Sequence, residues 1–274
     1  MVAVTSFQTF PDAAVTPYTT GDEAHALLCT ELDRFIALVE TLGTDDLGRP
    51  TACTAWNVGD ILAHQAGGYA SGLGYRQMFR QYAVIPRGGQ LIEDAINQRQ
   101  LQQRAGRSPA ELIAELRRSG PIAARKWAYQ FRLIKPVFAP HPVGGRLSVR
   151  HLMWIIHSRD TWMHRLDICR ATNRAFYQTA GHDGRIVALV MRDVAAVLRD
   201  QLGGQAVIFE LTGVAGGVWK IGPGQAAATI TMDALDFNIF ASGRFTTNEG
   251  LAKAAIRGDA ALAELALQKT VVLY

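Results

Sequence analysis

The hydrophobic residues change their spacing near Gly203-Gly204, and this change most constrains the fold. Before it, apolar residues recur every three to four positions, as on the buried face of a helix. After it, three short β-rich segments surround glycine turns: residues 206–212, 217–221 and 227–232. The sequence therefore predicts an α+β protein with a helical domain at residues 1–203 and a small α+β domain at residues 204–274.

Capping signals divide the helical region into separate helices. Ser108 begins a capping box that has proline at the first helical position, with an expected break at Gly120-Pro121, and Ser148 caps a later helix. The expected helices are residues 20–42, 57–81, 108–131, 148–171, 182–202, 236–242 and 249–268. Residues 270–274 are expected to form a closing strand. Residues 84–107 are expected to contain a polar, Gln-rich helical piece, and prolines and glycines mark a long loop within residues 132–147; the role of both segments stays open.

The composition is that of a globular protein with a sizeable core. The chain has 274 residues, of which 49% are hydrophobic and 19% charged. No apolar run approaches the roughly 20 residues of a membrane-spanning helix, and the start does not resemble a signal peptide. Three widely spaced cysteines (Cys29, Cys53 and Cys169) favour a reducing compartment over a disulfide framework. We therefore expect a cytoplasmic protein that does not bind membranes.

The net charge of +4 does not by itself indicate a nucleic-acid partner. Basic residues cluster between Arg76 and Arg107, but no groove-reading or aromatic-interleaved motif accompanies them. Solvated helix faces explain them better, and an anionic small substrate is also compatible with this charge. The glycine motifs of nucleotide-binding loops and the GxSxG motif of hydrolases are absent from the sequence.

Ionisable side chains lie on the apolar faces of two expected helices. Asp160 and His164 are four residues apart, so they lie about 40° apart around a helix. On the second helix, His64 is followed on its own face by Gly67 and Ser71, which leave space around it. Two imidazoles and a carboxylate can bind a divalent metal and leave one coordination position open. The alternative is a buried Asp–His hydrogen bond that fixes one helix against its neighbours.

Three further residues lie close enough in sequence to take part. His157 precedes Asp160 by about one turn and is a rival ligand, a partner of a ligand or a proton carrier. Asp60 precedes His64 by four residues and is open to the same roles, as a hydrogen-bond partner, a further carboxylate or a proton carrier. Asp167 either hydrogen-bonds a ligand histidine or pairs with a neighbouring arginine.

At these positions the chain resembles the mycothiol-dependent maleylpyruvate isomerase family, which belongs to the wider DinB-like metal-binding bundles. Residues 51–64, TACTAWNVGDILAH, are similar to that family's T-x-C-x-x-W-x-V-x-D-L-x-x-H segment. Residues 160–167, DTWMHRLD, are similar to its E-x-x-x-H-R-x-D segment, with Asp160 where the family more often has glutamate. The shorter side chain requires either a closer approach of the helices or an intervening water.

The resemblance implies a fold and a set of site residues. The fold is a DinB-like up-down four-helix bundle followed by a small domain similar to sterol carrier proteins. The bundle would hold a divalent metal, usually zinc, through His64, Asp160 and His164. The family's substrate-binding arginine would be Arg244, for which a surface arginine after a helix end is an equally good interpretation.

These observations favour a metal-dependent thiol S-transferase or isomerase. The open metal position would bind a low-molecular-weight thiol, which adds to an electrophilic small molecule. The resemblance nominates mycothiol as that thiol. One alternative is a non-catalytic small-molecule or lipid-binding protein with a structural or vacant metal site, and another is metal-assisted hydrolysis. We expect neither nucleic acid nor membrane as a partner, and the oligomeric state stays open, with a homodimer as one option.

Overall fold

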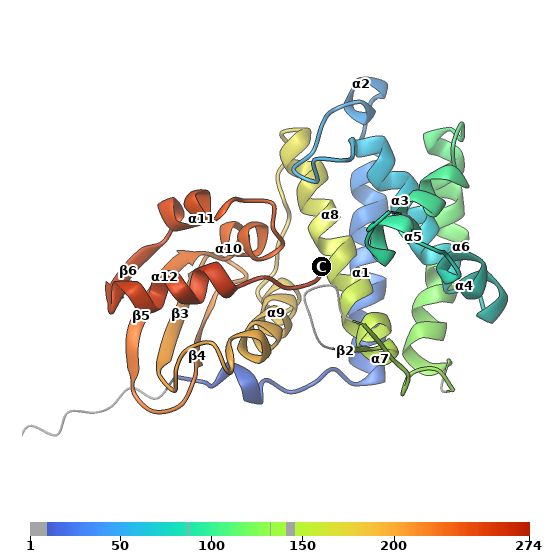
Figure 1. Cartoon of the computed structure of the whole chain (residues 1–274). Coiled ribbons are helices and arrows are strands. Elements are labelled where there is room, and N and C mark those ends of the chain that lie inside the picture. The colour runs from blue at the N-terminus through green and yellow to red at the C-terminus, as the bar shows by residue number, and fades with distance from the viewer. Residues whose placement is uncertain (1–9, 87, 132, 141–145) are drawn as a thin grey trace, which may run out of the picture. The chain divides into compact units, whose positions relative to one another are not determined.

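A computed structural model describes residues 10–86, 88–131, 133–140 and 146–274 (Figure 1). The chain forms two compact units. The helical unit comprises Thr19–Tyr177 together with Leu273–Tyr274, and the sheet unit comprises Gln178–Val272 together with residues 10–18. The predicted order, helical part first and α+β part second, is confirmed.

Four long helical segments form the core of the helical unit, and each packs against at least two of the others. They are α1 (Gly21–Val39), α3 (Val58–Ser71), α6 (Pro109–Tyr129) and a final run that ends with α8 (His157–Ala171). Shorter helices complete the unit: α2 (Thr44–Leu47), α4 (Tyr75–Tyr82) and α5 (Ile92–Gln102). The buried core includes Leu28, Phe35, Ile61, Leu116, Trp127 and Ile168. This packing brings α3 against α8.

Two glycines explain where the predicted helix boundaries were wrong. The predicted helix at residues 57–81 is two helices, because Gly72 ends α3 against Ala123 and Trp127, where a Cβ atom would find no room. Conversely, α6 continues through Pro121 without a break. Gly120 lies directly against Leu32 of α1, so the absence of a side chain lets the two helices approach closely.

The predicted helix at residues 148–171 is one helical run with an irregular middle. Ser148 caps it, since its hydroxyl accepts a hydrogen bond from the backbone N–H of His151 at 3.1 Å. A short α7 (Val149–His151) leads into a π-helical segment (Leu152–Ile156) and then into α8. Single π turns inside helices often mark functional sites. Here the π turn ends immediately before the segment that carries Asp160 and His164.

Before this run, two short antiparallel strands pair with each other. They are β1 (Phe138–Pro140) and β2 (Arg146–Ser148), with Phe138 opposite Ser148. The segment expected to be a long loop, residues 132–147, therefore contains β1 and the start of β2. Residues 84–107 contain α5, which confirms the expected Gln-rich helical piece.

The sheet unit is a four-stranded mixed sheet with helices. The strands are β3 (Ala206–Thr212), β4 (Gly217–Ile221), β5 (Ala226–Asp233) and β6 (Ala255–Gly258), in the order β4-β3-β5-β6. β5 runs parallel to β3, whereas the two outer pairs are antiparallel. The helices are α9 (Asp183–Leu198), α10 (Ala234–Ala241), α11 (Thr247–Lys253) and α12 (Ala260–Lys269). The three strands expected from the sequence are confirmed.

Three expectations for the C-terminal part were wrong. The predicted helix at residues 249–268 is interrupted by β6, because Gly258 adopts φ +84° and Asp259 then caps α12. Residues 270–274 form no strand. The compact units divide at Tyr177, not after residue 203, because α9 packs on β4, α10 and α12.

No helix among the described residues is long and apolar enough to cross a membrane.

Candidate metal centre

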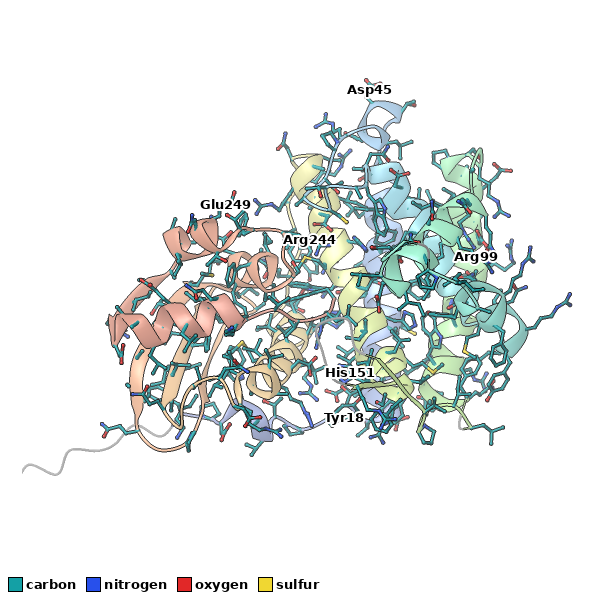
Figure 2. The ribbon with its side chains drawn as sticks, in the orientation of Figure 1. Tyr18, Asp45, Arg99, His151, Arg244 and Glu249 are labelled. Atoms are coloured by element: carbon teal, nitrogen blue, oxygen red, sulfur yellow. The ribbon has the colours of Figure 1, made fainter. Side chains whose placement is uncertain are left out.

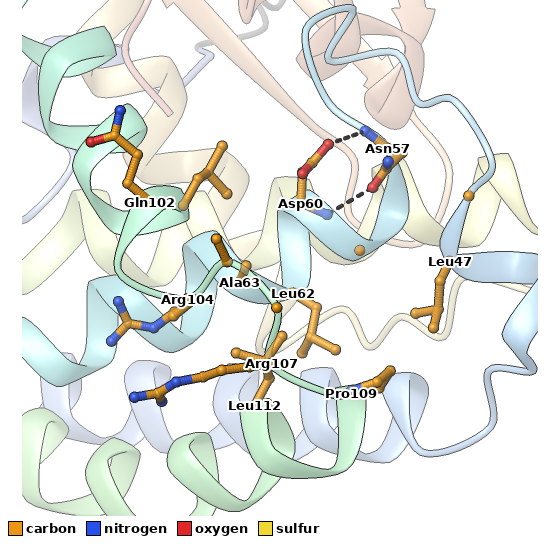
Figure 3. Close-up of a pocket in the computed structure, with 15 residues that line it drawn as sticks. Leu47, Asn57, Asp60, Leu62, Ala63, Gln102, Arg104, Arg107, Pro109 and Leu112 are labelled. Carbon is orange, nitrogen blue, oxygen red and sulfur yellow. Dashed lines mark hydrogen bonds between the residues drawn. The ribbon is translucent and has the colours of Figure 1, made fainter.

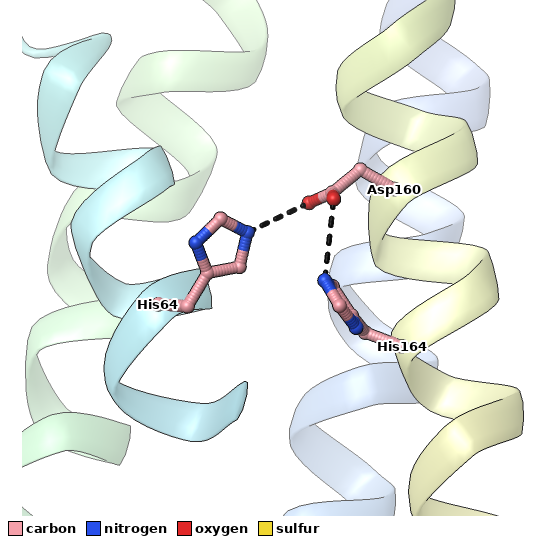
Figure 4. Close-up of side chains that lie close together, drawn as sticks. All are labelled: His64, Asp160 and His164. Atoms are coloured by element: carbon pink, nitrogen blue, oxygen red, sulfur yellow. Dashed lines mark hydrogen bonds and ion pairs between the residues drawn. The ribbon is translucent and has the colours of Figure 1, made fainter. Parts of the chain in front are cut away.

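His64, Asp160 and His164 converge inside the helical unit (Figure 4). One ligand-type atom from each side chain lies within 4.8 Å of the other two. The Nε2 atom of His64 is 3.3 Å from Oδ2 of Asp160, and Nε2 of His164 is 3.3 Å from Oδ1. The proximity expected from the sequence is therefore present, across a separation of about one hundred residues.

Local structure explains how α3 presents His64. Asn57 caps the helix by accepting a hydrogen bond from the N–H of Asp60 at 2.8 Å, and the Asp60 carboxylate accepts one from the N–H of Asn57 at 3.1 Å. This capping box fixes the first turn. The side chains of Ile61 and Leu62 then pack into the core. His64 lies one turn after Asp60, and 7% of its surface is exposed.

Asp167 fixes the orientation of His164. Its carboxylate, 1% exposed, lies 3.1 Å from Nδ1 of His164. A carboxylate only accepts, so Nδ1–H donates to it and Nε2 is left facing Asp160. Ligand histidines in metal sites commonly have such a carboxylate partner. The sequence left two partners open for Asp167, a ligand histidine or a neighbouring arginine, and the structure shows the hydrogen bond to His164.

The two imidazole nitrogens and the carboxylate suit a divalent first-row metal, zinc in particular. Trp56 lies beside both imidazoles, with ring centroids 4.7 Å from His64 and 5.5 Å from His164, and so forms an apolar wall. Within the described part of the chain, no other group of His, Cys, Asp or Glu side chains converges in this way. The donor set fits the metal that the sequence analysis proposed.

Without a cation, the ionised carboxylate of Asp160 pairs with the protonated imidazole of His164. Burial raises the pKa of Asp160, but the imidazoles of His164 and His64 outweigh burial and hold this pKa well below its ordinary value. Burial lowers the pKa of His164, but Asp160 and Asp167 outweigh burial and raise it to about 9. A metal ion therefore has to replace the proton on His164.

A family model, the mycothiol maleylpyruvate isomerase N-terminal domain, matches residues 28–169. This span is more than half of the 274 residues and contains all three cluster residues. The chain belongs to the mycothiol maleylpyruvate isomerase family. Membership of this family points to an enzyme of the isomerase or transferase type.

Two solved structures are similar to most of the chain: the mycothiol-dependent maleylpyruvate isomerase and a histidine-to-alanine mutant of it. Each has a TM-score of 0.55 and 14% sequence identity, and the match covers 89% of this chain and 98% of the solved one. At this identity the likeness establishes a shared fold. No curated protein sequence matches the chain.

The other predicted site residues of this family member fall in different places. His157 stacks on Trp127, with ring centroids 3.9 Å apart, and burial lowers its pKa to about 4. The charges of Asp160 and His64 also act on this pKa. Its ring is neutral at neutral pH. Arg244 follows α10 in the sheet unit and is partly buried (Figure 2).

The Asp60 carboxylate is occupied by the capping box and does not join the cluster. It lines a separate cavity of about 640 Å³ between α3 and the connection from α5 to α6 (Figure 3). Arg104 and Arg107 also line this cavity, and both are paired with Glu115. Asp60 therefore holds the start of the helix that carries His64.

Sequence reasoning missed one residue that contacts the cluster. Gln65 is 2% exposed, and its Nε2 donates to Oδ2 of Asp160 at 2.5 Å. Its Oε1 accepts from the hydroxyl of Thr161 at 2.9 Å. The available signal was a glutamine directly after His64 in an otherwise apolar stretch, Leu62 to Ala66. Buried amides of this kind usually have specific partners.

Proposed function

We propose that this chain is a metal-dependent thiol transferase or isomerase, in which His64, Asp160 and His164 hold a divalent cation, best matched by zinc. The observation that supports this most directly is the convergence of their ligand atoms within 4.8 Å. A bound cation would lower the pKa of a thiol at the open position and so provide a thiolate near neutral pH. Asp167 supports the proposal because its contact with Nδ1 directs Nε2 of His164 toward the cluster, where a cation would replace the proton.

We propose mycothiol as the thiol and an electrophilic small molecule as its partner. The family description and the two similar solved structures both name mycothiol. Addition of the thiol to an activated double bond gives an S-conjugate. Addition, rotation about the resulting single bond and loss of the thiol give cis–trans isomerisation, with no net change in atoms or electrons.

The proposed roles of the neighbouring residues follow from their surroundings. For His157 we propose a role in moving the proton that the thiol releases, and because burial lowers its pKa to about 4, its ring would hold that proton only transiently. Asp60 acts through the capping box, by holding the first turn of the helix that carries His64. For Arg244 we propose a contact with an anionic substrate, on the basis of the family resemblance alone.

We propose a cytoplasmic location because both the cysteines of the chain and the proposed cosubstrate are thiols. Cys29, Cys53 and Cys169 are not joined in disulfide bonds, as expected in a reducing compartment. A thiol cosubstrate also needs a reducing compartment to persist in its reduced form.

The test is transfer of mycothiol to monochlorobimane by the full chain, with and without a chelator, together with metal analysis. We expect transfer that the chelator abolishes and added zinc restores, and none from His64→Ala. His151→Ala is the control, because His151 lies in the same unit but outside the cluster. Equal rates with and without chelator, or no rate in either, would overturn the proposal. Less than about a tenth of an equivalent of metal would favour the binding-protein alternative.

A further inference from the structure

Gln65 and Asp160 form the shortest hydrogen bond described around the cluster, at 2.5 Å between Nε2 and Oδ2. We propose that Gln65 is a positioning residue that fixes the Asp160 carboxylate for the cation. This inference rests on the proposed metal site. It assigns a role to a residue on α3 that contacts the carboxylate from α8.

The Asp160 carboxylate needs such a partner because of its place in the cluster. Its side chain is 23% exposed, whereas those of His64 and His164 are 9% and 5% exposed. A single methylene group joins the Asp160 carboxylate to the backbone, so rotation about χ1 moves both carboxylate oxygens together. In the structure Oδ1 faces His164 at 3.3 Å, while Oδ2 faces His64 and receives the Gln65 N–H. The amide thus selects the rotamer that presents Oδ1 to His164.

A chain of hydrogen bonds sets the direction of the amide. Burial raises the pKa of Tyr69 far above its ordinary value, so its hydroxyl keeps its proton. The Thr161 hydroxyl, 3.1 Å away, directs its own hydrogen to other acceptors, so Tyr69 is the donor between these two hydroxyls. The Thr161 hydrogen is shared between Oε1 of Gln65 and the backbone carbonyl of His157, each at 2.9 Å. Because a carboxylate cannot donate, the NH₂ end of the amide faces Asp160. Both ends of the amide therefore have partners that fix its orientation.

A positioning role for Gln65 can be distinguished from a purely structural role by metal affinity. A buried amide that only joins α3 to α8 would affect the stability of the metal-free protein. A positioning residue also affects metal affinity, and its effect depends on the length of the carboxylate side chain. Glutamate at position 160 has an extra methylene and reaches further, so it should depend less on the amide.

The experiment measures the Kd of Zn²⁺ for the full chain by competition with a chromophoric chelator, alongside thermal unfolding of the metal-free protein. Gln65→Leu keeps the approximate shape of the side chain and removes the donor, and we expect Kd to rise about 10- to 100-fold. Gln100→Leu is the matched control, since Gln100 is 2% exposed and its side-chain amide donates to Gln81, outside the cluster. It should lower stability and leave Kd unchanged.

A double-mutant cycle tests the dependence on carboxylate length. In an Asp160→Glu background, Gln65→Leu should change Kd less than about threefold. If Gln65→Leu fails to fold, Thr161→Val replaces it, because loss of this hydroxyl frees the amide to rotate, and Thr161→Ser should restore the affinity.

The outcomes separate this inference from the proposed function. Zinc binding by the wild type with no change in Gln65→Leu would overturn the role of Gln65 and leave the metal site intact. An equal rise in Kd for Gln65→Leu and Gln100→Leu would also overturn it, as would an equal effect of Gln65→Leu in the wild type and in the Asp160→Glu background. Absence of zinc binding by the wild type would overturn both.

Discussion

Asp167 and His164 form a buried pair in which the carboxylate lies 3.1 Å from Nδ1 of the imidazole. The pair occupies positions three residues apart on α8, so one helical turn supplies both the ligand nitrogen and the group that orients it. This relationship lets Nε2 of His164 face Asp160 with no contribution from another helix.

Asp167→Ala should weaken zinc binding about 10- to 100-fold, because the imidazole loses the acceptor that fixes its orientation. Asp167→Asn should lie between this variant and the wild type, since its carbonyl oxygen can still accept from Nδ1–H. Zinc content after dialysis against a weak chelator measures the effect. Retention of a full equivalent by Asp167→Ala would contradict the orienting role.

Metal removal should lower the melting temperature of the wild type. A ligand that binds only the folded state stabilises it by about 2.7 kcal/mol at 100 times its Kd. Differential scanning calorimetry with and without chelator measures the shift. In His64→Ala the two traces should coincide, because the variant lacks one of the three ligands. A chelator-dependent shift of the same size in this variant would show that the stabilising metal binds elsewhere.

Unfolding should become easier as the pH falls through the range of His157. Its pKa is about 4 in the folded protein and about 6.5 in the unfolded chain, so the unfolded state binds more protons between these values. The contribution is present above pH 6.5 and is lost progressively down to pH 4, by about 3 kcal/mol at most. Urea unfolding of the metal-free protein from pH 7 to 4 measures this loss.

His157→Phe is the matched variant, because phenylalanine can keep the stacking on Trp127 and does not titrate. Its stability should fall less steeply over the same pH range. Identical slopes for the variant and the wild type would mean that another group causes the loss.

The Glu31–Arg165 ion pair should be sensitive to the loss of one partner. Arg165 donates from Nε and Nη2 to the two carboxylate oxygens at 3.0 and 3.1 Å, and both side chains are at most 3% exposed. Arg165→Met should destabilise the protein by about 3–5 kcal/mol, because Glu31 is left as a buried charge with its main partner removed. Chemical denaturation measures this.

Adding Glu31→Gln to Arg165→Met should recover part of the loss, since the uncompensated charge is removed. A double variant that is less stable than Arg165→Met by the full effect of Glu31→Gln would indicate that the two residues act independently. The pair joins α1 to α8, so the zinc affinity of these variants should also fall if the position of α8 matters to the cluster.

The sequence by itself determined the features that depend on neighbours along the chain. The capping boxes at Asn57 and Ser108 place the starts of α3 and α6, since each is a hydrogen-bond pattern within four residues. The spacing of Asp160 and His164 determines that they share a face of α8, because the helical repeat fixes that geometry. The β-rich segments after residue 204 likewise gave three of the four strands of the sheet.

Only the tertiary structure decided which of these local features meet. His64 reaches Asp160 because α3 packs against α8, and Gln65 reaches the same carboxylate from the next position. Asp60 is only four residues from His64 in sequence, yet it lines a cavity that is separate from the cluster. The β6 strand forms where a helix was predicted, because pairing with β5 outweighs the local helical preference of residues 255–258. Contacts between distant segments depend on how helices and strands pack, and packing is a property of the whole chain.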